Sequence, residues 1–236
     1  MTVDLNADVG EGYDDEPLFD VVTSVNIACG AHAGDEATMT RVIDAASRRG
    51  VAIGAHPSYP DREGFGRRSL VMETPEIRAT VLAQIDLLSG IAGSLGARIT
   101  HMKPHGALYN EAAIDPLLAA CLMDCAEARD LVLVGLAGSA MMFEDARGEG
   151  FADRAYSPDG TLSSRDLPGA LIEDPARAAA QAVALARGEP FTAIDGSTMA
   201  VKADTICCHG DTPGAVAIAR EVRRALEDAG LEVRAF

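Results

Sequence analysis

The stretch HMKPHGALYN, residues 101–110, combines side chains that can move protons with one that can stabilise negative charge. It contains His101, Lys103 and His105, which are two of the five histidines and one of the two lysines of the chain. An imidazole can act as a general acid or base near neutral pH, and a lysine ammonium can stabilise a developing oxyanion. Pro104 excludes a helix here, so the two histidines are not a helical pair. We therefore expect a strand end and a following loop that form part of a site.

All five histidines fall at the ends of predicted strands. Alternating residues predict a strand over 98–103, and short apolar runs predict seven others. The expected strands are 2–7, 24–29, 51–56, 98–103, 131–136, 150–155, 205–209 and 231–235. At or just past their carboxyl ends lie His32, His56, His101, His105 and His209. Parallel barrels carry their active sites on this face, so we expect the five histidines to line one concave pocket with Asp8 and Lys103.

Amphipathic stretches between the strands predict helices, most of which begin at a Thr-Pro or Asp-Pro pair. The expected helices are 36–49, 75–95, 115–128, 175–187 and 213–229. Alternating strands and helices predict a parallel sheet in an α/β fold. Because no nucleotide fingerprint marks the switch point of an open sheet, we expect a single-domain (β/α) barrel of about seven parallel strands. The segment 188–204 breaks the alternation and predicts an inserted β-hairpin around Asp195-Gly196.

Composition excludes several classes of protein. Apolar residues make up 48% of the chain, which excludes disorder, and no apolar run approaches the ~20 residues of a membrane span. The formal net charge of −16 argues against a nucleic-acid-binding surface. No basic region followed by an apolar segment opens the chain, so we expect no secretory signal. Five cysteines, an odd number, argue against a disulfide framework, and we expect a cytoplasmic protein with reduced thiols.

Strand alternation places further polar residues on the faces that carry histidines. Asn6 and Asp8 share one face of the first strand, and His101 and Lys103 share one face of the fourth. We take Asp8, His101, Lys103 and His105 as candidate catalytic residues. Candidates for binding substrate or phosphate are Asn6, Asn26, His32, His56, Arg67, Arg68, Asp153, Arg154, His209 and Asp211.

Several of these candidates have structural interpretations that stay open. A lone histidine is more often a satisfied core or surface residue than a ligand. Arg67 and Arg68 can hold a carboxylate or a phosphate, but solvated arginines are the more common case. Asp153 and Arg154 form either a pair within a site or a structural ion pair.

A bound metal ion is a further possibility. Asp8 with His32 and His56 would provide one carboxylate oxygen and two imidazole nitrogens, which suit zinc or a similar divalent ion. No pair of residues has a dedicated metal-binding spacing, because proline interrupts His101-x-x-x-His105. A divalent metal therefore stays an alternative to a metal-free site.

Seven segments of the chain, in the same order, resemble the LamB/YcsF family, whose members are described as the A component of 5-oxoprolinase. They are LNADVGEG (5–12), NIACGAHAGD (26–35), GVAIGAHPSYPDREGFGRR (50–68), HMKPHGALYN (101–110), GLAGS (135–139), FADRAYSPDGTL (151–162) and CCHGDTPGA (207–215). The resemblance implies a seven-stranded (β/α) barrel of the glycoside hydrolase/deacetylase type. In one departure, this chain runs from Gly12 directly into Tyr13 and Asp14, where family members usually have a longer loop with glycine and tryptophan.

The resemblance also implies ATP-dependent opening of the lactam 5-oxoproline to L-glutamate, with subunits B and C as partners and ATP with Mg²⁺ as co-substrate. Phosphorylation of the lactam oxygen would activate the carbonyl carbon for attack by water. Lys103, with Arg67 or Arg68, would stabilise negative charge. The general base would be Asp8, His101 or His105.

Two other functions stay open. One is a stand-alone metal-dependent deacetylase or amidohydrolase, which stoichiometric zinc would favour. The other is a non-catalytic subunit that holds an intermediate for its partners. The chain has no G-x-x-x-x-G-K-[ST] loop, so we expect part of the ATP machinery on the partner subunits. We also expect Lys103 to be functional rather than structural, so that Lys103→Ala leaves the thermal midpoint nearly unchanged.

Overall fold

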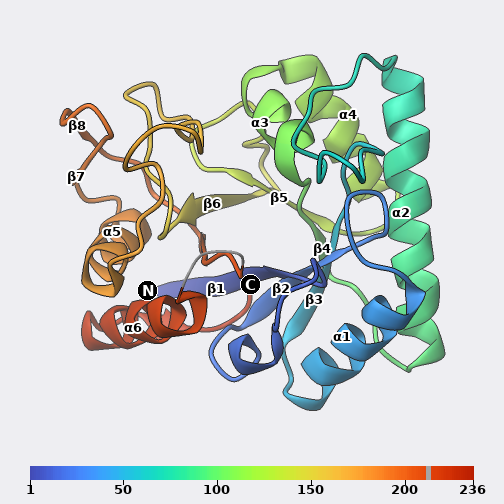
Figure 1. The fold of residues 1–236 in the computed structure, drawn as a ribbon, viewed down its shortest axis with the longest axis horizontal. Helices are drawn as coiled ribbons and strands as arrows, with labels where there is room; N and C mark the ends of the chain where they lie inside the picture. The colour runs from blue at the N-terminus through green and yellow to red at the C-terminus, as the bar shows by residue number, and fades with distance from the viewer. Residues whose placement is uncertain (211–213) are drawn as a thin grey trace.

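Parallel strands form a closed barrel, and helices cover its outside (Figure 1). The computed structural model describes residues 1–210 and 214–236. The strands of the barrel are β1 (Thr2–Val9), β2 (Ser24–Ala28), β3 (Ala52–His56), β4 (His101–Met102), β5 (Val132–Leu136), β6 (Arg147–Phe151) and β9 (Thr205–Cys207). Each strand pairs in parallel with its neighbours, and β9 closes the barrel by pairing with both β6 and β1. The expected (β/α) barrel of about seven parallel strands is therefore confirmed.

The helices follow the expected order, with one addition. They are η1 (Glu16–Leu18), α1 (Glu36–Arg48), α2 (Thr74–Ser94), α3 (Gly106–Ile114), α4 (Pro116–Glu127), α5 (Pro175–Arg187) and α6 (Ala215–Asp228). The strand expected at 150–155 lies earlier, as β6, and the one expected at 98–103 contributes only β4. The helix start expected at Thr212-Pro213 lies outside the described residues.

Side-chain caps fix several helix starts. Asp115 and Asp174 each accept hydrogen bonds from backbone N–H groups in the first turns of α4 and α5, which begin with proline. At α2 the capping residue is Glu73 rather than the expected Thr74, and the Glu73 N–H donates to the Glu76 carboxylate at 3.1 Å. The Asp-Pro signals were therefore accurate to the residue, and the Thr-Pro signal at α2 was one residue late.

The sequence did not predict α3, although this helix begins inside the HMKPHGALYN stretch. No amphipathic period marks it, because its buried residues point in several directions and include Ala107, Leu108, Tyr109, Ala112 and Ala113. Gly106 begins the helix with φ +60°, and a Cβ on it would lie 2.3 Å from Gly66 O. Only glycine fits this position, which is where α3 meets the loop that follows β3.

Strand β1 shows why the interior of the barrel is polar. Its sequence TVDLNADV alternates, so the apolar residues pack towards the surrounding helices and Asp4, Asn6 and Asp8 point into the barrel. Asp4 accepts hydrogen bonds from Ser24 Oγ at 2.7 Å and from Thr205 Oγ1 at 2.5 Å. These contacts tie β1 to the neighbouring strands β2 and β9 at the point where the barrel closes.

Smaller elements complete the fold. Strand β10 (Glu232–Val233) pairs with the start of β1, and the ring of Phe236 then lies 5.4 Å from that of His101, between centroids. Strands β7 (Phe191–Thr192) and β8 (Thr198–Met199) form the antiparallel hairpin expected within 188–204. None of the described helices combines the length and the apolar character that crossing a membrane requires.

Gly54 of β3 lies against the ring of His101 inside the barrel. A Cβ at Gly54 would lie 2.2 Å from ring atoms of His101, and that ring is held by Asn26 Oδ1 at 3.1 Å. We expect Gly54→Ala to lower the free energy of unfolding by about 1–3 kcal/mol, measured by urea denaturation, because the interior must repack. The control is Gly90→Ala on the exposed side of α2, where an added Cβ meets no atom within 4 Å and should not destabilise. Equal stability of the two variants would contradict the prediction.

Candidate active site

A cavity of about 620 Å³ opens at the carboxyl ends of the barrel strands. The βα loops converge on this end, where parallel barrels place their functional residues. Its polar and aromatic lining includes Asp8, Glu11, His56, Arg67, Lys103, His105, Tyr109, Phe151, Arg154, Arg165 and His209. The sequence-based expectation of a site at this end therefore agrees with the position of the cavity.

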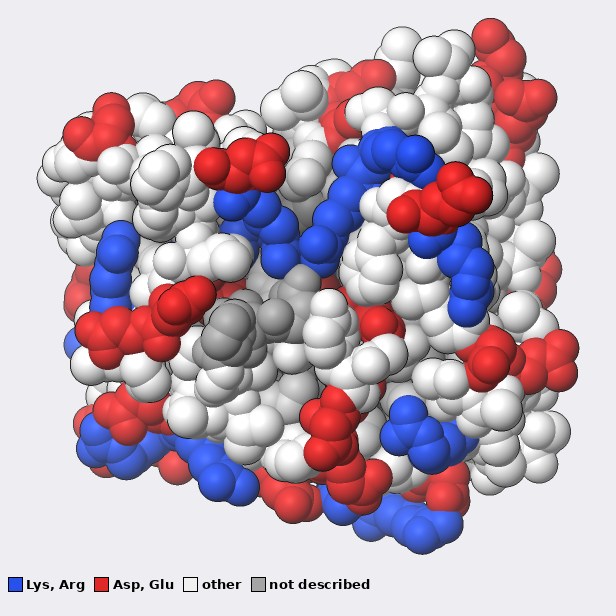
Figure 2. All heavy atoms as spheres, viewed as in Figure 1, with Lys and Arg blue, Asp and Glu red and all other residues white. Residues whose placement is uncertain are grey.

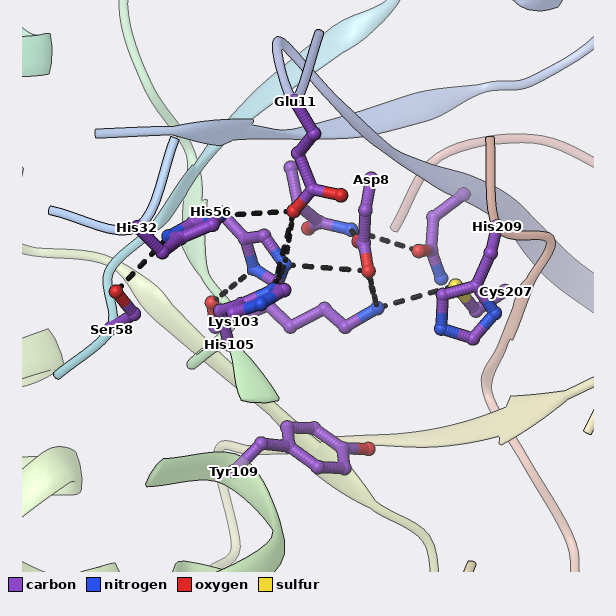
Figure 3. A network of polar contacts seen from close by, with 12 residues as sticks. Asp8, Glu11, His32, His56, Ser58, Lys103, His105, Tyr109, Cys207 and His209 are labelled. Carbon is purple, nitrogen blue, oxygen red and sulfur yellow. Dashed lines mark hydrogen bonds and ion pairs between the residues drawn. The ribbon is translucent and has the colours of Figure 1, made fainter. Parts of the chain in front are cut away.

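The ammonium of Lys103 lies at the floor of the cavity between two carboxylates (Figure 3). Its Nζ is 2.9 Å from Asp8 Oδ1 and 2.7 Å from Glu149 Oε1, and the side chain is only 2% exposed. Burial disfavours the charged ammonium, but the two carboxylates outweigh it and raise the pKa of Lys103 well above its usual value. The Asp8 carboxyl is likewise buried, yet His56 and Lys103 hold its pKa well below the usual range.

Glu149 and Tyr109 belong to this group, and the sequence analysis missed both. Tyr109 donates its hydroxyl to Glu149 Oε2 at 2.8 Å, and Asn6 Nδ2 donates to Glu149 Oε1 at 3.1 Å. Burial and the Glu149 carboxylate raise the pKa of Tyr109 well above its usual value, so the phenol stays protonated. Glu149 preceded the strand expected at 150–155, although a lone acidic residue between two glycines was an available signal. Tyr109 was missed together with α3.

A second polar layer lies beneath the cavity. Asn26 Nδ2 donates to Asn6 Oδ1 at 2.9 Å and to Asp8 Oδ1 at 2.8 Å, and His101 Nε2 donates to Asn26 Oδ1 at 3.1 Å. Burial lowers the pKa of His101 to about 3, which keeps its ring neutral. Asn6, Asn26 and His101 thus position the Asp8 carboxylate from below, and none of them lines the cavity.

Three histidines and Glu11 form a cluster at one wall of the cavity (Figure 3). Glu11 Oε1 lies 2.9 Å from His32 Nε2, 3.2 Å from His105 Nδ1 and 3.8 Å from His56 Nε2. Burial lowers the pKa of His32 to about 4 and also lowers that of His105. The cluster extends to Asp8, whose Oδ2 lies 3.3 Å from His56 Nε2.

The expectation that all five histidines line one pocket is wrong for two of them. His56, His105 and His209 line the cavity, as expected. His32 lies behind His105, with the two rings stacked at 3.8 Å between centroids, and His101 lies one layer deeper. Strand parity gives the face on which a residue lies but not its depth along the barrel axis, which explains the error for His101.

The remaining candidates separate into residues at the cavity and residues away from it. Asp153 holds His209, with Oδ1 at 2.9 Å from Nδ1 and Oδ2 accepting from the backbone N–H at 2.9 Å. Arg154 lines the cavity and donates Nη2–H to Ser163 O at 2.7 Å. Asp153 therefore orients a cavity histidine. Asp211 lies outside the described residues.

Arg67 and Arg68 have different surroundings. Arg67 lines the cavity and lies over the ring of Phe65, 4.8 Å from its centroid. Arg68 pairs with Asp61 at the surface, where its side chain is 60% exposed, and it does not line the cavity. Of the two expected arginines, only Arg67 is placed to contact a ligand in the cavity.

Comparison with known proteins gives a consistent set of matches. The model of the LamB/YcsF family matches residues 3–236. A relative from Methylococcus capsulatus, named as the A component of 5-oxoprolinase, is 49% identical over 100% of this chain and 96% of its own length. A relative of the same name from Agrobacterium fabrum, the first of a numbered series there, is 47% identical over 99% of this chain and 97% of its own length.

Solved structures resemble the chain at two levels. The crystal structure of a lactam utilization protein from Thermus thermophilus superimposes with a TM-score of 0.91 at 42% identity, over 100% of both chains. A family 4 carbohydrate esterase from Streptomyces lividans superimposes with a TM-score of 0.56 at 12% identity, over 98% of this chain and 91% of its own. The second likeness concerns the fold alone.

The burial of Lys103 changes the expectation for its substitution. Lys103→Met would leave the Asp8 and Glu149 carboxylates buried without their shared ammonium, so we expect the free energy of unfolding to fall by about 3–5 kcal/mol in urea denaturation. This replaces the sequence-based expectation of a nearly unchanged thermal midpoint. Adding Glu149→Gln to Lys103→Met should restore part of the loss, because it removes one uncompensated charge. The matched control is Lys202→Met at an exposed position, and a Lys103 variant as stable as this control would refute the prediction.

Proposed function

The chain belongs to the LamB/YcsF family, and we propose that it is the A component of an ATP-dependent 5-oxoprolinase, which hydrolyses the lactam 5-oxoproline to L-glutamate. The full-length similarity to relatives that carry this name supports the proposal. The structural observation that carries it is the cavity, where a buried ammonium, two histidines and several arginines face one small volume.

The charge around the cavity supports an anionic substrate. Arg67, Arg154 and Arg165 line it, although the whole chain has a formal net charge of −16. Figure 2 shows basic side chains gathered around a hollow near the middle of this face. A ring of positive charge attracts both the carboxylate of 5-oxoproline and the phosphates of ATP, which would enter with Mg²⁺.

The proposed reaction activates the lactam carbonyl before the ring opens. Transfer of the γ-phosphoryl group of ATP to the lactam oxygen releases ADP, and water then adds to the ring carbon. Cleavage of the C–N bond gives an open acyl phosphate, which a second water hydrolyses to glutamate and phosphate. Lys103 and Arg67 would stabilise the negative charge that develops on these oxygens. His209, which Asp153 orients, fits the general base better than His101, which lies below the cavity.

A metal-dependent deacetylase or amidohydrolase is the second candidate. The cluster of three histidines and Glu11 supports it, because such side chains bind catalytic metal ions. The likeness to a carbohydrate esterase does not add to this support, since it concerns only the fold. Assays of acetylated sugars and simple amides with the zinc-loaded chain would test this candidate.

We expect the isolated chain not to hydrolyse 5-oxoproline, with or without ATP, because its sequence lacks a phosphate-binding loop of the G-x-x-x-x-G-K-[ST] kind. The missing machinery would be supplied by subunits B and C. The test incubates the purified chain with ATP, Mg²⁺ and 5-oxoproline, and then adds the two partner subunits. Glutamate and ADP should appear together, and only after the addition. Sustained coupled turnover by the chain alone would refute the partner requirement, and release of acetate from acetylated substrates would favour the second candidate.

The two neighbouring arginines provide a matched pair of variants in the assembled enzyme. We expect Arg67→Met to reduce kcat/KM for 5-oxoproline by about 10²–10³-fold, because it removes a charge from the cavity wall. Arg68→Met should change kcat/KM little, since Arg68 faces the surface and pairs with Asp61. Urea denaturation of both variants checks that the barrel is intact. Equal losses in kcat/KM would contradict the assignment of Arg67 to the site.

A further inference from the structure

The outer ring nitrogens of two cluster histidines fix where their protons lie. His56 Nδ1 lies 2.7 Å from Lys103 O, and His105 Nε2 lies 2.9 Å from Phe65 O. A carbonyl oxygen only accepts hydrogen bonds, so both of these nitrogens must carry hydrogen. A neutral imidazole has one N–H group, and therefore His56 Nε2 and His105 Nδ1 each present a bare lone pair to the cluster.

These lone pairs meet other acceptors inside the cluster. His56 Nε2 and His105 Nδ1 lie 2.9 Å apart, and Glu11 Oε1 is a further acceptor 3.2 Å from His105 Nδ1. His32 is oriented in the same way, because Ser58 Oγ donates to Tyr59 O and so accepts from His32 Nδ1. His32 Nε2 then also presents a lone pair, 2.9 Å from Glu11. Acceptors that face one another in a buried site require a positive charge between them.

We propose that Glu11, His32, His56 and His105 bind one divalent transition-metal ion, for which zinc is the best fit. Their four ligand atoms all lie within 4.8 Å of one another. Ligand atoms around a tetrahedral zinc ion lie roughly 3.3 Å apart, at zinc–ligand distances of about 2.0 Å. Three imidazole nitrogens and one carboxylate oxygen form a set that zinc prefers.

The supporting structure is that of a metal site. The ligands follow or end four consecutive strands, β1 to β4, so the barrel holds them in place. The outer nitrogen of each histidine contacts a backbone carbonyl or a hydroxyl, and such contacts orient metal-bound imidazoles. The rings of His32 and His105 lie parallel at 3.8 Å, so they must tilt towards a shared ion.

Protonation alone satisfies the cluster less well than one metal ion. A single proton between His56 and His105 would leave Glu11 facing bare nitrogens of His32 and His105. Protonating both His32 and His105 would place two cations in one ring stack, 3.8 Å apart. One ion with two positive charges satisfies all four acceptors together.

The proposed ligands differ from those expected from the sequence. Glu11 replaces Asp8 as the carboxylate, and His105 is added to His32 and His56. Asp8 already pairs with Lys103. A second group, Asp8, Cys207 and His209, is excluded because the Lys103 ammonium lies 3.3 Å from Cys207 Sγ and would repel a cation. The inference does not depend on the lactam reaction, and zinc by itself therefore no longer separates the two candidate functions.

The test measures metal in the full chain, purified without an affinity tag, by elemental mass spectrometry and by titrating the chelator-stripped protein with zinc. We expect about one zinc ion per chain in the wild type and in the control His209→Asn. We expect Glu11→Gln and His105→Asn to lose the ion. Ser58→Ala should weaken zinc affinity by about 10–100-fold, because it removes the group that orients His32.

X-ray absorption on the zinc-loaded wild type gives a result that does not depend on variants that fail to fold. The expected first shell contains nitrogen and oxygen with imidazole scattering, and no sulfur. A stripped wild-type chain that takes up no zinc would overturn the proposal. A sulfur ligand, or loss of zinc in His209→Asn with retention in His105→Asn, would also overturn it, by placing the ion at Cys207.

Discussion

The interior of the barrel depends on the buried ammonium of Lys103. Asp8 and Glu149 come from β1 and β6, and neither carboxylate would be tolerated inside the barrel without a shared cation. Asn6 and Asn26 then hydrogen-bond to these carboxylates from the layer below. One charge thus organises side chains from most of the barrel. A loss of activity in a Lys103 variant consequently reports the integrity of this network as well as any chemical role of the ammonium.

A second constraint acts a few ångströms away, at the histidine cluster. Backbone carbonyls fix the outer nitrogens of His56 and His105, and so they direct lone pairs inward towards Glu11. The two constraints share the Asp8 carboxylate, which contacts both Lys103 and His56. A cation in the cluster would therefore compete with the ammonium for the same carboxylate, and the charge at the cavity floor is set jointly by both sites.

Much of this arrangement was predictable from local patterns, and the rest depended on how the barrel closes. The alternation in TVDLNADV placed Asp8 inside correctly, and the positions of histidines at strand ends indicated the right end of the barrel. Glu149 was missed because its strand was expected to start after it. Tyr109 was missed because α3 has no amphipathic period. The stagger between strands decides which residues meet across the interior, and no pattern within a single strand specifies it, which is why His101 was assigned to the wrong layer.

The stretch HMKPHG distributes three functional groups over three depths of one barrel. Its ladder contains only β4, after which Pro104 ends the pairing. His101 thus contacts the lower polar layer, Lys103 the cavity floor and His105 the cavity wall. These buried groups are already held by one another, so the cavity is preorganised before any ligand enters. Arg67 at the lining is not part of that buried network, and charges of this kind are the ones that a small anion would meet first.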